Sequence, residues 1–142
     1  MIRHAIPLFV IMTAAAAVIL VFYLRRQHKK IRSYQRRCTQ KATGTFEEYR
    51  YYGSPKHPKV CGARFSYRAP DGEIAKPVFP IQSTPFRRGD TLEFWFDPDN
   101  YYFVCTDSMI KSLRRDMIWS VVMAAVWIAA GLAILLLDLH LY

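Results

Sequence analysis

The sequence lacks the closely spaced cysteines and histidines that mark a metal or redox site. Its three cysteines, Cys38, Cys61 and Cys105, form no CxxC pair and are odd in number, whereas a secreted disulfide framework has an even set. We therefore expect reduced thiols, although a Cys61–Cys105 bridge stays open if this part of the chain faces outward. With His57 the cysteines supply ligand types found in zinc sites, but their scatter favours buried thiols acting as small apolar residues. No metal or cofactor is expected.

Catalytic constellations are missing as well. Asp97, Asp99 and Asn100 lack the glycine and the bidentate glutamate of an EF-hand calcium loop, and their spacing is typical of a turn. Glu47 and Glu48 are adjacent, so on a strand they face opposite sides and cannot work as a carboxylate pair. The serines and histidines form no nucleophile–base motif. These absences predict a protein that is not an enzyme and has no catalytic residue.

Acidic residues are missing from one stretch in which eight basic residues gather. They are Arg25, Arg26, Lys29, Lys30, Arg32, Arg36, Arg37 and Lys41. The net charge of +9 would suit nucleic acid, but no recognised nucleic-acid-binding fold accompanies the block, and it directly follows an apolar run. Juxtamembrane basic residues set membrane topology and contact anionic lipid head groups. We therefore expect this block to face lipid, and we expect no nucleic-acid partner.

Two long runs contain no charged residue, at residues 5–24 and 117–137. As helices they rise about 30 Å, which matches the hydrocarbon core of a bilayer. The first is not expected to be a cleaved signal peptide, because its basic block follows the apolar run instead of preceding it. We predict two transmembrane helices, with residues 25–37 continuing the first as a basic juxtamembrane helix. Residues 106–116 lead into the second as an amphipathic connector.

Residues 38–105 carry the alternation of apolar and polar side chains that predicts β-strands. Five short strands are expected, at residues 42–52, 60–68, 73–81, 91–96 and 101–105. In the second strand, alternate residues from Cys61 to Tyr67 are apolar and are expected to face a core. A sheet of this size tends to close or to curve strongly, since closure removes its edges. The predicted fold class is an α+β membrane protein in which two transmembrane helices flank a small five-stranded antiparallel β-barrel or curved-sheet domain.

The distribution of basic residues predicts the side of the membrane on which this domain lies. Lys111, Arg114 and Arg115 precede the second apolar run, and the basic block follows the first. Arg3 is the one Lys or Arg on the other side of the two runs. Cytoplasmic segments carry the excess of Lys and Arg. We therefore expect an integral, two-pass protein with its central domain in the cytoplasm and both termini outside.

Several segments of the central domain together resemble a known family. They are Cys38-Thr39, residues 42–45, residues 60–67 and residues 88–100 (RGDTLEFWFDPDN). Over residues 38–137 the chain resembles the bacterial membrane-protein family named domain of unknown function 3592. The resemblance implies a location in the cell membrane of a bacterium, and it brings no catalytic residue across.

Exposed aromatic residues are the candidate contact surface for a partner. Trp95 alternates to the outer face of its strand, where it can anchor a partner or the membrane surface unless the sheet closes over it. The tyrosines of the same expected edge are Tyr49, Tyr51, Tyr52, Tyr101 and Tyr102.

The second apolar run carries a face of small residues. Ala125, Ala129 and Ala133 recur every four residues, and such faces let helices approach closely. Thr13 and Ala17 of the first run are the expected partners within the chain. Packing of this face against a second copy, or against lipid, stays open.

These features predict a non-enzymatic accessory module that is anchored in the membrane and presents a small β domain to another protein or to anionic lipid. The alternative is a small membrane subunit of a larger transport or secretion assembly that acts through its transmembrane helices. A homo-oligomer stays open for either role.

Overall fold

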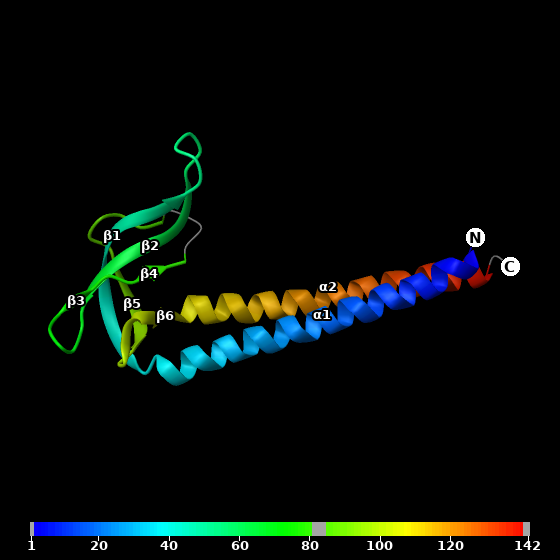
Figure 1. Cartoon of the computed structure of the whole chain (residues 1–142), viewed down its shortest axis with the longest axis horizontal. Coiled ribbons are helices and arrows are strands. Elements are labelled where there is room, and N and C mark those ends of the chain that lie inside the picture. The colour runs from blue at the N-terminus through cyan, green and yellow to red at the C-terminus, as the bar shows by residue number, and fades with distance from the viewer. Residues whose placement is uncertain (1, 81–84, 141–142) are drawn as a thin grey trace. The chain divides into compact units, whose positions relative to one another are not determined.

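The computed structural model describes residues 2–80 and 85–140, which divide into two compact units (Figure 1). The first is a helical hairpin that includes the residues up to Ile31 and from Lys111 onward, and the second is a β unit that spans residues 32–110. The elements are, in order, α1 (Ile2–Arg37), β1 (Gln40–Tyr52), β2 (Lys59–Arg68), β3 (Ile74–Ala75), β4 (Val78–Phe79), β5 (Thr91–Asp97), β6 (Asn100–Cys105) and α2 (Asp107–His140).

Both helices are long and apolar enough to cross a membrane, judged by length and composition. α1 continues without a break from its apolar run into the basic residues up to Arg37, because the basic stretch has neither glycine nor proline and consists of good helix formers. α2 begins at Asp107, and the Met109 backbone N–H donates to Thr106 Oγ1 at 3.2 Å. This cap satisfies a backbone donor that has no partner within the helix.

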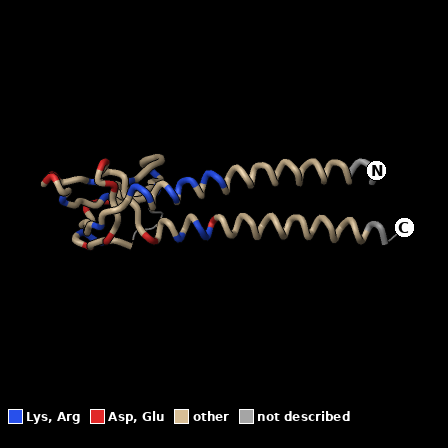
Figure 2. Tube along the Cα trace, turned by 90° about the horizontal axis from the view of Figure 1, so that it is seen from below, with Lys and Arg blue, Asp and Glu red and all other residues tan. Residues whose placement is uncertain are grey.

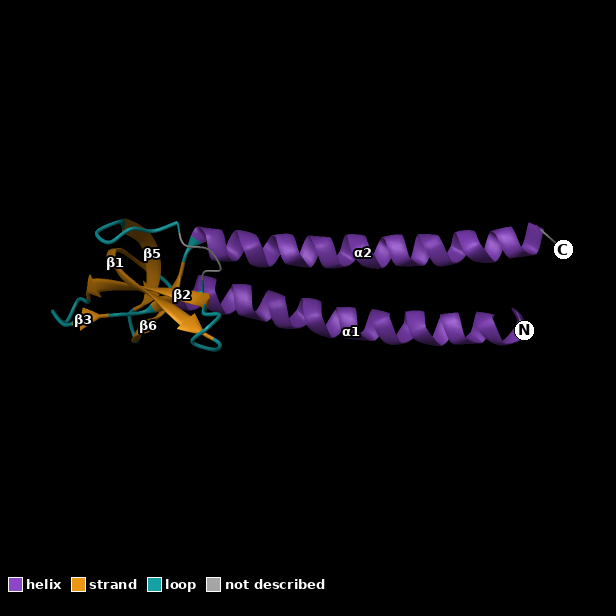
Figure 3. Ribbon diagram, turned by 90° about the horizontal axis from the view of Figure 1, so that it is seen from above, coloured by secondary structure: helices purple, strands orange, loops and turns teal. Residues whose placement is uncertain are grey.

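The two helices lie side by side in the hairpin (Figure 3). The Phe9 ring lies on Gly131, where a Cβ atom would overlap with it. The same ring stacks on Trp127 with the ring centroids 6.3 Å apart. The lack of a side chain at Gly131 is therefore what lets the aromatic ring of one helix reach the backbone of the other.

The β unit contains one antiparallel sheet with the strand order β3-β2-β1-β5-β6, in which β4 also pairs with β2. The sheet curves so that β4 approaches β6, but no hydrogen-bonded ladder joins its two edges within the described ranges. The predicted antiparallel sheet between two apolar helices is confirmed. Of the two predicted forms, a barrel and a curved sheet, the barrel is wrong, because the sheet stays open within the described ranges.

The strand predicted at residues 73–81 is wrong as a single element. It forms two short strands, β3 and β4, with Lys76 and Pro77 between them. Proline has no N–H to donate to a ladder, so it interrupts the pairing, while its carbonyl accepts a hydrogen bond from the Phe65 N–H at 3.1 Å. Among the described residues the sheet thus has six strands and not five. Ile81, the predicted last residue of this strand, lies outside the described residues.

The core of the β unit is built from aromatic rings packed edge to face. Phe65 and Phe79 meet with their ring centroids 5.3 Å apart and their planes at 89°. Phe94 packs against Phe79 at 5.2 Å and against Tyr67 at 4.9 Å. Such T-shaped pairs are favoured by the ring quadrupole, in addition to the apolar area that they bury. Gly44 of β1 leaves room for this packing, since a Cβ there would lie 2.8 Å from Phe94 Cε1.

A β-bulge changes the expected alternation of β2. The pairing of β1 with β2 shifts register between Arg50 and Tyr51, which leaves Cys61 without a partner residue on β1. Ala63 and Tyr67 are buried as predicted, but Cys61 is exposed. The prediction of Cys61 as a core residue is wrong because the extra residue of a bulge interrupts the two-residue period.

Candidate functional site

The last turn of α1 is fixed to the sheet within the β unit by an ion pair. Arg37 Nε donates a hydrogen bond to Asp97 Oδ2 at 2.8 Å, and Arg37 Nη2 lies 2.8 Å from the same oxygen. The guanidinium carbon of Arg37 is 4.0 Å from the centroid of the Phe103 ring. Tyr34, one turn earlier in α1, also stacks on the Phe103 ring, with the ring centroids 5.1 Å apart. An arginine that combines a carboxylate and an aromatic face is held in one orientation.

Asp97 is prepared for this contact by the turn between β5 and β6. Its side chain is 5% exposed, and its Oδ1 accepts a hydrogen bond from the Asp99 backbone N–H at 2.9 Å. That backbone donor and the Arg37 guanidinium lower the pKa of Asp97 from its ordinary value, against the opposing effect of burial. Asp97 is therefore ionised at neutral pH. The sequence had explained this carboxylate as part of a turn only, and no local pattern pointed to Arg37.

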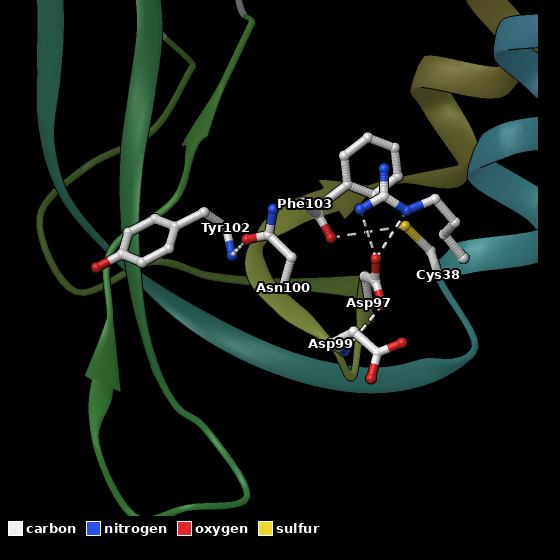
Figure 4. A network of polar contacts seen from close by, with 7 residues as sticks. Cys38, Asp97, Asp99, Asn100, Tyr102 and Phe103 are labelled. Atoms are coloured by element: carbon white, nitrogen blue, oxygen red, sulfur yellow. Dashed lines mark hydrogen bonds and ion pairs between the residues drawn. The ribbon is translucent and has the colours of Figure 1, made fainter.

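Two thiols lie in the same cluster. Cys38 Sγ donates to the Phe103 carbonyl oxygen at 3.6 Å. Figure 4 shows Cys38 and Phe103 close together, with the Tyr102 ring pointing away from them. Burial, assisted by the neighbouring Cys105 thiol, raises the pKa of Cys38 to about 12. Burial also raises the pKa of Cys105. Both thiols therefore stay protonated at neutral pH and are poor nucleophiles.

The cysteine arrangement differs from the bridge that the sequence left open. Cys105 lies beside Cys38, and both are buried, whereas Cys61 is exposed on β2. All three are free thiols in the structure. Within the described ranges, no three His, Cys, Asp or Glu side chains gather in a way that could hold a metal ion.

The predicted tyrosine edge divides into structural and exposed residues. The Tyr49 hydroxyl donates to the Phe86 carbonyl at 2.8 Å and accepts from the Phe86 N–H at 2.6 Å. The Tyr101 carbonyl accepts a hydrogen bond from the Tyr67 hydroxyl at 2.6 Å, and its side chain packs on the core. Burial raises the pKa of Tyr67 to about 12. The structure thus gives Tyr49 and Tyr101 roles inside the domain.

Four aromatic side chains of the predicted contact surface remain accessible. Tyr51 and Tyr52 are each 58% exposed at the end of β1, and Tyr102 is 65% exposed on β6. Trp95 is 37% exposed on the outer face of β5, so the sheet does not close over it. Tyr51 and Trp95 thus keep the accessibility that their predicted contact role requires.

The predicted topology residues lie at one end of each helix (Figure 2). Within the hairpin, exposed basic residues follow the apolar run of α1 and precede that of α2; they are Arg25, Arg26, Lys29 and Lys30 on α1 and Lys111, Arg114 and Arg115 on α2. Because the helices run antiparallel, the two groups share one end of the hairpin. Arg32 and Arg36 are also exposed, whereas Arg37 pairs with Asp97.

The helix face predicted to pack within the chain is not the one that does so. Ala125, Ala129 and Ala133 are exposed on the hairpin. A pocket of about 320 Å³ between the helices is lined instead by Thr13, Ala16, Ala17, Leu20, Met123, Ala124, Trp127 and Ile128. Thr13 and Ala17 thus line this pocket together with Met123, Ala124, Trp127 and Ile128 of α2, and not with the three alanines. The contact between Phe9 and Gly131 selects the neighbouring face, and the three alanines stay accessible to a second helix.

In comparisons with known proteins, no family model matches the chain, and no significant match occurs among curated proteins or solved structures. The resemblance to domain of unknown function 3592 stays a prediction.

Proposed function

We propose that this chain is an integral membrane protein whose two helices span the bilayer and whose β unit is a non-enzymatic interaction module in the cytoplasm. The observation that carries the proposal is the pair of apolar helices that precede and follow the sheet, with their basic residues at one end of the hairpin. Basic residues next to a span are retained on the cytoplasmic side. The resemblance noted above supports a bacterial cell membrane as the location.

The interior of the β unit supports an interaction role over catalysis. Its buried space is filled by phenylalanine and tyrosine rings, its buried thiols are protonated, and its buried carboxylate is held by Arg37. The accessible features are aromatic side chains and cations, which are the residue types that bind protein partners and lipid surfaces. We therefore assign the function of this protein to binding through the exposed side chains of the β unit.

Extraction of membranes tests the insertion of the helices. Membranes from cells that express the full chain are washed with alkaline carbonate and then floated in a density gradient. The proposal predicts that the chain stays with the floated membranes and leaves them only in detergent. Release by carbonate alone would contradict it, because peripheral proteins are stripped under these conditions and spanning helices are not.

A second candidate function is that of a small subunit in a larger membrane assembly. The exposure of Ala125, Ala129 and Ala133 on the hairpin favours it, since a small-residue face can receive a second helix. Ala129→Leu is expected to abolish cross-linking to a membrane partner or a second copy while the β unit stays folded. Ala130→Leu, next to it on another exposed face, is the control. Equal cross-linking of both variants and the wild type would rule this candidate out.

A further inference from the structure

We infer that the tip of the β1–β2 hairpin, residues 50–59, docks on the anionic head groups of the bilayer in which the helices are anchored. This inference rests on the proposed function, because only an anchored chain keeps the tip near a membrane. The partner is the lipid surface itself, and an acidic protein is the competing occupant.

The charge of the hairpin tip matches an anionic surface. Arg50, Lys56 and Lys59 are exposed, and no ion pair engages them in the part of the chain that the structure describes. Acidic residues are absent from the whole stretch between Glu48 and Asp71. Clustered, unpaired cations are attracted to the negative potential of anionic lipid and lose that attraction as salt screens it.

Two aromatic side chains accompany the cations. Tyr51 and Tyr52 are consecutive and each is 58% exposed, so the tip presents an aromatic ring on both faces of the two-stranded ribbon. A tyrosine ring is apolar along its body and polar at its hydroxyl, which suits the boundary between head groups and acyl chains. The cations and the exposed tyrosines of the tip therefore together form a surface suited to the membrane interface.

The geometry of the hairpin makes the tip available. β5 pairs with β1 only from Gln40 to Thr45, whereas β2 pairs with β1 as far as Tyr52, so the tip is a two-stranded ribbon beyond the body of the sheet. Figure 1 shows this hairpin projecting from the other strands. Gly53 has a φ of 99°, and the His57 N–H donates to the Ser54 carbonyl at 3.0 Å, which gives the turn a defined shape.

The turn between β2 and β3 is a natural comparison, because it has the opposite charge. It contains Asp71 and Glu73 at exposed positions and no cation from Ala69 to Glu73. An anionic bilayer should attract the hairpin tip and repel this turn. A probe at each position in the same protein background therefore separates lipid docking from general closeness to a membrane.

The experiment uses the full chain in nanodiscs with an environment-sensitive fluorophore at a single introduced thiol. Ser54→Cys carries the probe at the tip and Asp71→Cys carries it at the control turn, both in a Cys61→Ser background. The nanodiscs contain either phosphatidylcholine alone or phosphatidylcholine with phosphatidylglycerol, and head-group nitroxide lipid serves as the quencher. Incorporation into nanodiscs is scored first by size-exclusion chromatography.

The inference predicts a blue shift and several-fold stronger quenching at position 54 in anionic nanodiscs than in neutral ones. High salt, or the combined substitution of Arg50, Lys56 and Lys59 by Gln, should remove the difference, and the probe at position 71 should not respond. Equal emission and quenching at position 54 in both lipids would overturn the inference while leaving the anchored protein in place. Failure of the chain to enter nanodiscs would instead overturn the proposed function on which it rests. A response at position 54 only after addition of an acidic protein would assign the tip to that partner and also overturn the inference.

Discussion

Arg37 and Asp97, 60 positions apart in the sequence, are joined by two guanidinium nitrogens that each lie 2.8 Å from one carboxylate oxygen. The pair connects the last residue of α1 with the end of β5, inside the β unit. Asp97 is nearly inaccessible and also accepts the Asp99 N–H, so loss of Arg37 would leave a buried carboxylate with backbone donors but without this countercharge. We regard this pair as the contact that holds the last turn of α1 against the end of β5 within the β unit.

Asp97→Asn is expected to lower the stability of the β unit in a pH-dependent way. The folded-state pKa of Asp97 is lowered, so its contribution is fully present above the unfolded value of about 3.9 and is lost as the pH falls through the folded value. The melting temperature of the wild type, followed by near-ultraviolet circular dichroism in detergent, should therefore fall more steeply below about pH 4 than that of the variant. Parallel curves for the two proteins would show that the pair contributes nothing to stability.

Gly44→Ala is expected to destabilise the core by about 1–3 kcal/mol, the usual cost of overpacking. The new Cβ would lie 2.8 Å from Phe94 Cε1 and 3.2 Å from Phe65 Cβ, and both rings are fully buried. Thr43→Ala, on the exposed face of the same strand, should change stability by less than about 0.5 kcal/mol. Denaturant unfolding of the full chain in detergent measures both variants, and a neutral Gly44→Ala would mean that the aromatic core is loosely packed.

The thiols are expected to differ sharply in reactivity. Cys61 is exposed, while Cys38 and Cys105 are buried with raised pKa values. Of the three thiols, one should react readily with a water-soluble disulfide reagent in the folded protein, and the other two only after denaturation. Cys61→Ser should remove the fast phase alone. Three equal rates in the native protein would contradict the burial of the pair.

The elements that the sequence predicted correctly depend on local patterns. The apolar runs and the alternation in β2 from Ala63 to Tyr67 each follow from residues within a few positions of one another. The sequence left a barrel and a curved sheet as alternatives, since closure depends on whether two distant edges meet. The split at Pro77 was not foreseen.

The candidate site was less accessible to sequence reasoning because its contacts are nonlocal. Nothing near Asp97 indicates Arg37, and nothing near Cys105 indicates Cys38. Likewise, the alanine period of α2 was visible, but the face that packs on α1 is chosen by Phe9 and Gly131, which the period does not reveal. Tyr49 appeared as a surface residue because its bond to Phe86 spans a loop.

Charge reversal of the first basic group is expected to invert or scramble the topology. Changing Arg25, Arg26, Lys29 and Lys30 to Glu removes the signal that retains this flank in the cytoplasm. Reversal of Arg87 and Arg88, which lie on an exposed turn of the β unit, is the control and should leave the topology as it is. The readout is accessibility of Cys61 in intact cells. Unchanged insertion of the fourfold variant would show that this block is not the topology signal.

Labelling of Cys61 with a membrane-impermeant maleimide, in intact and in permeabilised cells, tests the central claim most directly. Cys61 suits the purpose because it is the exposed cysteine, whereas Cys38 is shielded within the β unit. As a matched control, Arg3→Cys in a Cys61→Ser background reports on the opposite side. The account predicts that Cys61 reacts only after permeabilisation and that the thiol at position 3 reacts in intact cells. Reaction of Cys61 in intact cells would place the β unit outside and contradict a module that acts at the cytoplasmic face.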